Sequence, residues 1–276
     1  MVFIASGVYV GNTLGGILGT GLMFHGGWCI TGPVVGAFNI LPLLLLPLIK
    51  TDTADDYIQI SDEDDLPNPT DYLTFFQHFA YYMPDFLFFM NNVSFSVLTF
   101  VVPFRMDHYM GKTLEQTVYE LNILCTVVIV PGVVIAYLIT KKLDVIISLI
   151  VLNIVFYAGS IMMYLSSTKT LNFLYEFHVS SVFVGLSDVI VTNILILSKF
   201  VMFEKWKKDI TGMDLAQHAS RVFNVSDSLG HIAGAVLSSF SSYKDGETFT
   251  LTMFAVLMTT TTIGMIISKI SVKVSD

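Results

Sequence analysis

Long uninterrupted apolar runs constrain the fold of this chain more than any other feature. A helix needs about 20 mostly apolar residues to cross a bilayer, and eight segments meet that requirement. They are residues 2–21, 28–49, 77–103, 119–140, 144–165, 177–203, 219–240 and 248–270. Only 13% of the residues are charged, about half the share in a soluble domain. The sequence therefore predicts an all-α polytopic membrane protein and excludes a soluble domain, a disordered chain and a nucleic-acid binder.

The distribution of charge predicts the orientation. Eight of the 22 acidic residues lie between Lys50 and Asp71, and the remaining 14 balance the 14 basic residues. With eight spans, ten basic residues, Lys199 among them, fall on the side of the termini, and four fall on the other side. The positive-inside rule then places both termini in the cytoplasm. Asp85 near the cytoplasmic end of its span is expected to be solvated, and Trp206 among lysines is expected to anchor at the interface.

Glycines repeat in two of the predicted spans. The first span carries Gly7, Gly11, Gly15 and Gly16, and the seventh carries Gly230 and Gly234 at matching positions. Small residues at this spacing let helix backbones approach closely. The match is explained either by convergent helix packing or by duplication of a six-span unit, which is common in transporters. Under duplication, and because Met1 directly precedes an apolar run, we expect a parent protein with four more helices before Met1.

Two aspartates lie near the centres of predicted spans, Asp188 in the sixth and Asp227 in the seventh. A charged side chain at the bilayer centre costs about 2.5–3.5 kcal/mol, so such residues face a cavity or a partner. Helical spacing places further polar residues beside them or on a neighbouring span: Ser181, Thr192, Asn224, His231 and Asn92. These residues predict a polar cavity in which carboxylates bind a proton and a cation alternately. The alternative is a structural role, with carboxylates bonded between helices and His231 in packing rather than in a proton relay.

Several motifs resemble those of the major facilitator superfamily. The glycine run Gly7–Gly16 is similar to the antiporter motif of the family's fifth helix, although Asn12 stands where the family usually has proline. The segments Gly185–Asp188 and Asn224–Asp227 resemble the tenth and eleventh helices of the vesicular amine transporter branch. The resemblance implies the last eight of twelve helices. Residues 1–49 would end the N-terminal half, 50–74 would form the acidic cytoplasmic loop, and 75–276 would form the complete C-terminal half.

The sequence and this resemblance together favour a secondary active transporter that exchanges small organic cations for protons. The resemblance to the amine transporter branch implies a vesicle or another endomembrane as its location. No phosphate-binding loop, metal-ligand cluster or catalytic motif is present in the sequence, so we expect no enzyme activity, metal or cofactor. The competing interpretation is a truncated, non-transporting membrane protein, either a splice form or a regulatory partner. A uniporter or channel is a third possibility, and it would carry flux without a pH gradient.

Overall fold

The computed structural model describes residues 33–34, 70–71, 73–111, 113–167, 173–206, 212–241 and 246–274. This part of the chain is built from six long helices and contains no strand. They are α2 (Phe75–Met110), α3 (Leu114–Lys142), α4 (Val145–Ser166), α5 (Phe173–Lys205), α6 (Gly212–Ser241) and α7 (Gly246–Val274). The first two predicted spans, the glycines at 7, 11, 15 and 16, and most of the acidic loop lie outside the described residues.

Local sequence signals set the helix ends. Gly111 adopts a left-handed conformation with φ of 63° and ends α2, as glycine commonly does after a helix because it has no Cβ. Thr113 and Gln116 form a capping box at the start of α3. Asp144 caps α4 by accepting hydrogen bonds from the amides of Ile146 and Ile147, at 3.0 and 3.1 Å. These caps satisfy backbone amides that have no partner within the helix.

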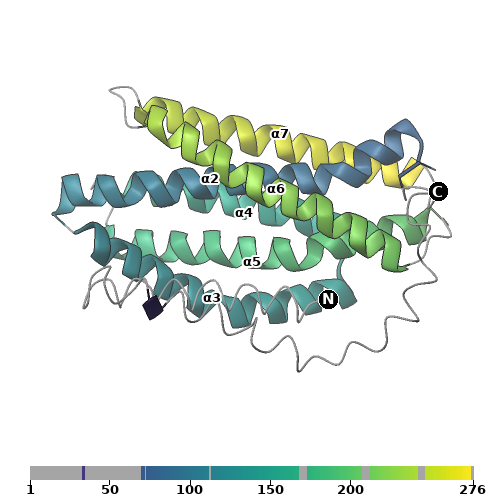
Figure 1. The fold of residues 1–276 in the computed structure, drawn as a ribbon, viewed down its shortest axis with the longest axis horizontal. Coiled ribbons are helices and arrows are strands. Elements are labelled where there is room, and N and C mark those ends of the chain that lie inside the picture. The colour runs from purple at the N-terminus through teal and green to yellow at the C-terminus, as the bar shows by residue number, and fades with distance from the viewer. Residues whose placement is uncertain are drawn as a thin grey trace.

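The six helices lie side by side as an elongated bundle, with α6 crossing α2 obliquely (Figure 1). α2 occupies the centre, since it contacts each of the five other helices. α2 and α6 run in the same direction, and α5 runs in the opposite direction (Figure 1). Polar side chains on α2 can therefore meet residues from α5 and α6 deep inside the bundle.

Within the described residues, four helices are long and apolar enough to cross a membrane: Phe75–Tyr109, Val145–Ser166, Glu176–Lys205 and Gly246–Lys273. The chain is therefore a helical, membrane-embedded protein. Six spans were predicted over this stretch, and the segments 119–140 and 219–240 do form helices, α3 and α6, without being among the four. For α6 the reason is composition, because ionisable residues such as His218, Arg221 and Asp227 interrupt its apolar sequence. The predicted total of eight spans is not reached in the described residues.

Glycines bring α6 unusually close to α2. A Cβ added at Gly230 would lie 2.6 Å from the Cβ of Asn92, and one added at Gly234 would lie 2.5 Å from the carbonyl oxygen of Val93. Only residues without a side chain allow this separation. The close approach holds the polar residues of α6 within hydrogen-bonding distance of α2.

Candidate functional site

One polar cluster joins α2 to α6. We call it the Asp227 cluster: Asn92, Ser96, Asp227 and His231. The Asn92 amide donates to Asp227 Oδ1 at 3.2 Å, and His231 Nε2 lies 3.6 Å from the same oxygen. Ser96 Oγ and His231 Nδ1 share a hydrogen bond of 2.7 Å. The sequence predicts Asp227 as a proton-coupling or cation-binding residue and Asn92 and His231 as lining residues, and the structure joins these three to Ser96 in one connected chain of contacts.

The Asp227 cluster has an open side. The side chains of Asp227 and His231 are 43% and 48% exposed, whereas Asn92 and Ser96 are buried. The described helices therefore leave this face of α6 uncovered. Ionisable side chains within a membrane face the bundle interior or water, because contact with lipid is costly. The exposed face of α6 is thus suited to line an aqueous cavity.

A second polar cluster is largely enclosed, with three buried members and one partly buried histidine. We call it the Lys199 cluster: Tyr81 and Asp85 of α2, Lys199 of α5 and His218 of α6. The Lys199 ammonium donates to the Asp85 carboxylate and to the carbonyl oxygen of Tyr81. It also lies 3.9 Å from the centre of the Tyr81 ring, within the range of cation–π attraction. The side chains of Lys199 and Asp85 are 0% and 4% exposed, so this ion pair is shielded from solvent.

His218 connects α6 to this enclosed pair. Its Nδ1 shares a hydrogen bond of 2.7 Å with the Tyr81 hydroxyl, and its ring lies 5.6 Å from the Tyr81 ring, centre to centre. Three helices thus contribute to the Lys199 cluster. Buried charges in proteins are normally paired and hydrogen-bonded, and the Lys199 ammonium meets that requirement through Asp85 and Tyr81 of α2.

The Lys199 cluster overturns one sequence-based prediction. The sequence predicts a solvated Asp85, but both Asp85 and its partner Lys199 are buried. Trp206, predicted at the membrane interface, is also buried, at 6% exposure. A charge count along the sequence cannot recognise a partner 114 residues away. The sequence does contain one indication that Asp85 faces the interior, since helical spacing places it on the same helix face as Asn92 and Ser96.

The two clusters lie at different depths. Tyr81 contacts His218, and Asn92, further along α2, contacts Asp227, further along α6. Tyr81 and Asn92 are separated by 11 residues, which corresponds to about 16 Å of helix. Asp188 also precedes Lys199 by 11 residues, or about three turns, on the same face of α5. Because α5 runs opposite to α2 (Figure 1), three turns back along α5 from Lys199 correspond to about three turns forward along α2 from Tyr81, which is the level of Asn92.

The remaining predicted lining residues differ in their surroundings. Ser181 donates to the Phe177 carbonyl at 2.7 Å and Thr192 donates to the Asp188 carbonyl at 2.9 Å, both within α5. Asn224 is exposed on α6. Gly230 and Gly234 pack against α2. The structure therefore brings Asn92 and His231 to Asp227, while Ser181 and Thr192 direct their hydroxyls to backbone of their own helix.

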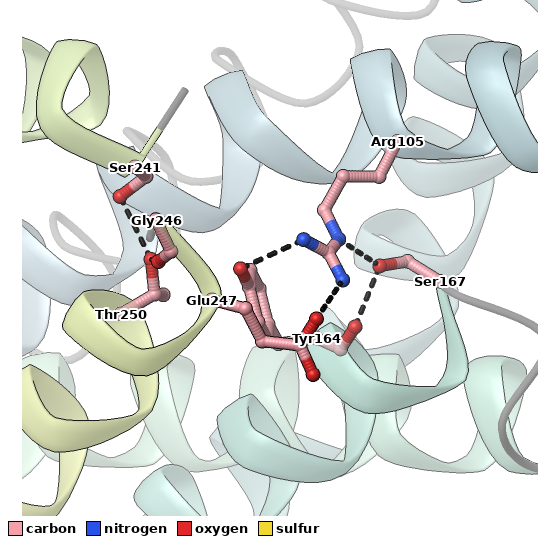
Figure 2. A network of polar contacts seen from close by, with 7 residues as sticks. All are labelled: Arg105, Tyr164, Ser167, Ser241, Gly246, Glu247 and Thr250. Carbon is pink, nitrogen blue, oxygen red and sulfur yellow. Dashed lines mark hydrogen bonds and ion pairs between the residues drawn. The ribbon is translucent and has the colours of Figure 1, made fainter. Parts of the chain in front are cut away.

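A third network ties α2, α4 and α7 together near the far end of α2 (Figure 2). Arg105 donates to the Tyr164 hydroxyl at 2.8 Å and to Ser167 Oγ at 3.1 Å, and it forms an ion pair of 3.4 Å with Glu247. Its guanidinium also lies 4.2 Å from the centre of the Tyr164 ring. These contacts use most of the hydrogen-bond donors of Arg105, so the network stabilises the packing of the helices.

At the opposite end of the bundle, Asp144 pairs with Lys269 of α7. Burial alone would raise the pKa of the Asp144 carboxyl, but hydrogen bonds from Lys269 and the Ile147 amide, with the charges of Lys269 and Lys205, lower it below its ordinary value of 3.8. A group with a depressed folded-state pKa stabilises the fold above its unfolded-state pKa. That stabilisation is lost as the pH falls through the folded-state pKa.

We therefore expect Asp144→Asn to lower stability by up to about 1 kcal/mol at neutral pH, the range for a partly exposed pair. Asparagine still caps the helix, so only the charge is lost. The melting temperatures of the two proteins in detergent should converge as the pH is lowered from about 6 to below about 3.8, near the ordinary aspartate pKa. A difference that stays constant over this range would show that the carboxylate charge contributes nothing.

Comparisons of the chain with family models, curated proteins and solved structures gave no match. The function of the protein is therefore inferred from the residues of the polar clusters. Among the described residues, no group of histidines, cysteines and acidic residues has the arrangement of a metal site.

Proposed function

We propose that this protein is a secondary active transporter that exchanges small organic cations for protons. The observation that carries the proposal is the Asp227 cluster, a carboxylate and a histidine half-exposed on a helix that packs within a membrane bundle. A carboxylate in such a site attracts a cation, and its immediate environment is preorganised by Asn92. The exposed sides of Asp227 and His231 are accessible to a ligand that approaches α6.

His231 links Asp227 to Ser96 and so helps to fix the position of the carboxylate. The Ser96 hydroxyl can donate to a neutral His231 Nδ1 or accept from a protonated one, so their 2.7 Å contact survives either state. His231 therefore stays beside Asp227, which supports a fixed carboxylate as the ligand for the cation.

The major facilitator resemblance supplies a framework for the whole cycle. In that framework α2–α7 are the C-terminal half, both termini are cytoplasmic, the eight predicted spans are the last eight of twelve, and the membrane is a vesicle or another endomembrane. Two halves would rock about a site near the midplane to alternate access. The uncovered polar face of α6 supports this framework, since the other half would lie opposite it.

The test is uptake of a permanently charged probe, 1-methyl-4-phenylpyridinium, into proteoliposomes that contain the full chain and an acidic lumen. We expect Asp227→Asn and Asp188→Asn to abolish accumulation at unchanged protein abundance. A bound organic cation would cover the Asp227 carboxylate, and loss of a charge partner that is buried in this way costs about 2 kcal/mol or more in binding, which is more than tenfold in affinity. The matched control is Asp107→Asn, since Asp107 is an exposed aspartate near the end of α2, and it should accumulate the probe normally.

Normal accumulation in both variants would refute the assigned site. Absence of accumulation by the unaltered protein would favour the second interpretation, a non-transporting chain whose open α6 face docks a partner. Flux that needs no pH gradient would instead indicate a uniporter or channel.

A further inference from the structure

The Lys199 cluster contains a carboxylate oxygen that the proposed cation site does not use. Asp85 Oδ2 pairs with Lys199, whereas Asp85 Oδ1 is buried and has no hydrogen-bond partner within the described part of the chain. An unsatisfied buried acceptor costs free energy, and a proton is a ligand small enough to reach an enclosed site. The residue as a whole is 3% exposed.

The Lys199 ammonium would remain held if Asp85 were neutralised. It keeps the Tyr81 carbonyl as an acceptor, with the Tyr81 and Tyr82 ring centres 3.9 and 5.7 Å away. From α6, His218 faces the pair and the charge of the exposed Arg221 acts on His218, while α7 contributes the uncharged Ser268, whose hydroxyl donates to the Ala80 carbonyl. The cluster can therefore change charge without losing its cation.

We propose that Asp85 is the proton-coupling site of the transporter and that the Asp227 cluster is a separate site for the organic cation. Proton uptake converts the Asp85 carboxylate to a carboxylic acid with the new O–H on Oδ1. The Lys199 cluster gains one positive charge, and the departing cation removes one from the Asp227 cluster. Charge and atoms balance, and no other reactant is needed. This inference rests on the transport function proposed above.

The geometry couples the two sites electrostatically. Asp85 and Asn92 share one face of α2, and Asn92 bonds Asp227 directly. Asp85 and Asn92 are seven residues apart, which corresponds to roughly 10–11 Å of helix. At that separation, with an effective dielectric constant of about 20, two like charges disfavour one another by about tenfold in binding. A proton at Asp85 thus weakens cation binding at Asp227 and favours release.

Two assays on the full chain in proteoliposomes test this inference. The first measures accumulation of 1-methyl-4-phenylpyridinium driven by a pH gradient. The second measures exchange of labelled for unlabelled probe at equal pH, which requires cation binding and alternating access but no net proton movement. A gradient of about one pH unit supports about tenfold accumulation for each proton exchanged.

We expect Asp85→Asn to lose accumulation and to retain exchange. Because this variant leaves Lys199 without its counter-charge, the double variant Asp85→Asn/Lys199→Gln repeats the test with no buried charge. The matched control is Asp144→Asn/Lys269→Gln, which removes the same kind of pair from the more exposed end of the bundle and should retain both activities.

Two results would contradict the assignment of proton coupling to Asp85. Retention of both activities by Asp85→Asn and the double variant would overturn the inference, because protons would then couple elsewhere. Loss of both activities by a folded double variant would also overturn it, because the pair would then be required for cation movement itself. If the unaltered protein shows neither activity, the proposed transport function fails, which is a different outcome from either of these.

Discussion

Replacing Lys199 with methionine is expected to destabilise the folded protein by about 3–5 kcal/mol, the usual cost of removing one partner of a buried ion pair. Asp85 would remain in a site with almost no exposure, with one carboxylate oxygen already unpartnered in the described structure. Methionine fills a similar volume, so the effect reports the missing charge rather than a cavity. The measurement is thermal unfolding of the purified protein in detergent at neutral pH.

The double variant Lys199→Met/Asp85→Asn shows how much of this loss comes from leaving the Asp85 carboxylate buried without a counter-charge. Replacing both members of a buried pair is often close to neutral, because the desolvation penalty of both charges disappears with their attraction. We therefore expect the double variant to recover most of the lost stability. A double variant as unstable as Lys199→Met, or a single variant that loses less than about 1 kcal/mol, would mean that the pair is not buried as a charged pair.

Much of the helical framework was predictable because it depends on local properties. The predicted span 144–165 agrees closely with α4, Val145–Ser166, because an apolar run there begins directly after the capping Asp144. The span 77–103 was predicted too short, since α2 continues to Met110 and ends only at Gly111. Hydropathy marks where a helix is apolar, whereas capping residues determine where it ends.

Polar contacts within one helix could be predicted from the sequence, whereas contacts between helices could not. Helical spacing placed Asp227 and His231 one turn apart, and their ion-pair distance of 3.6 Å agrees with that spacing. Spacing also placed Asn92 and Ser96 on one face of their helix, but which helix that face contacts depends on tertiary packing. The Lys199–Asp85 pair is entirely non-local, so a count of charges along the sequence could not show that the Lys199 charge is paired inside the bundle.

Substitution of Gly234 by valine is expected to have the second large effect, because α6 and α2 are closest there. Any Cβ at this position would lie 2.5 Å from both the Val93 carbonyl oxygen and the Ser96 Cβ. The carbonyl belongs to a helix backbone and cannot rotate away, so the helices must separate. Overpacking of this kind costs about 1–3 kcal/mol, and we expect the upper part of that range in a thermal unfolding measurement.

The control is Ala235→Val, because Ala235 is the next residue of the same helix and is exposed. The β-branched side chain costs only a few tenths of a kcal/mol through helix propensity there. Separation of α6 from α2 would also lengthen the Ser96–His231 and Asn92–Asp227 contacts, so Gly234→Val should weaken probe binding while Ala235→Val leaves it unchanged. Equal effects of the two substitutions would show that close packing at Gly234 does not hold the Asp227 cluster together, and that helix propensity alone explains the loss.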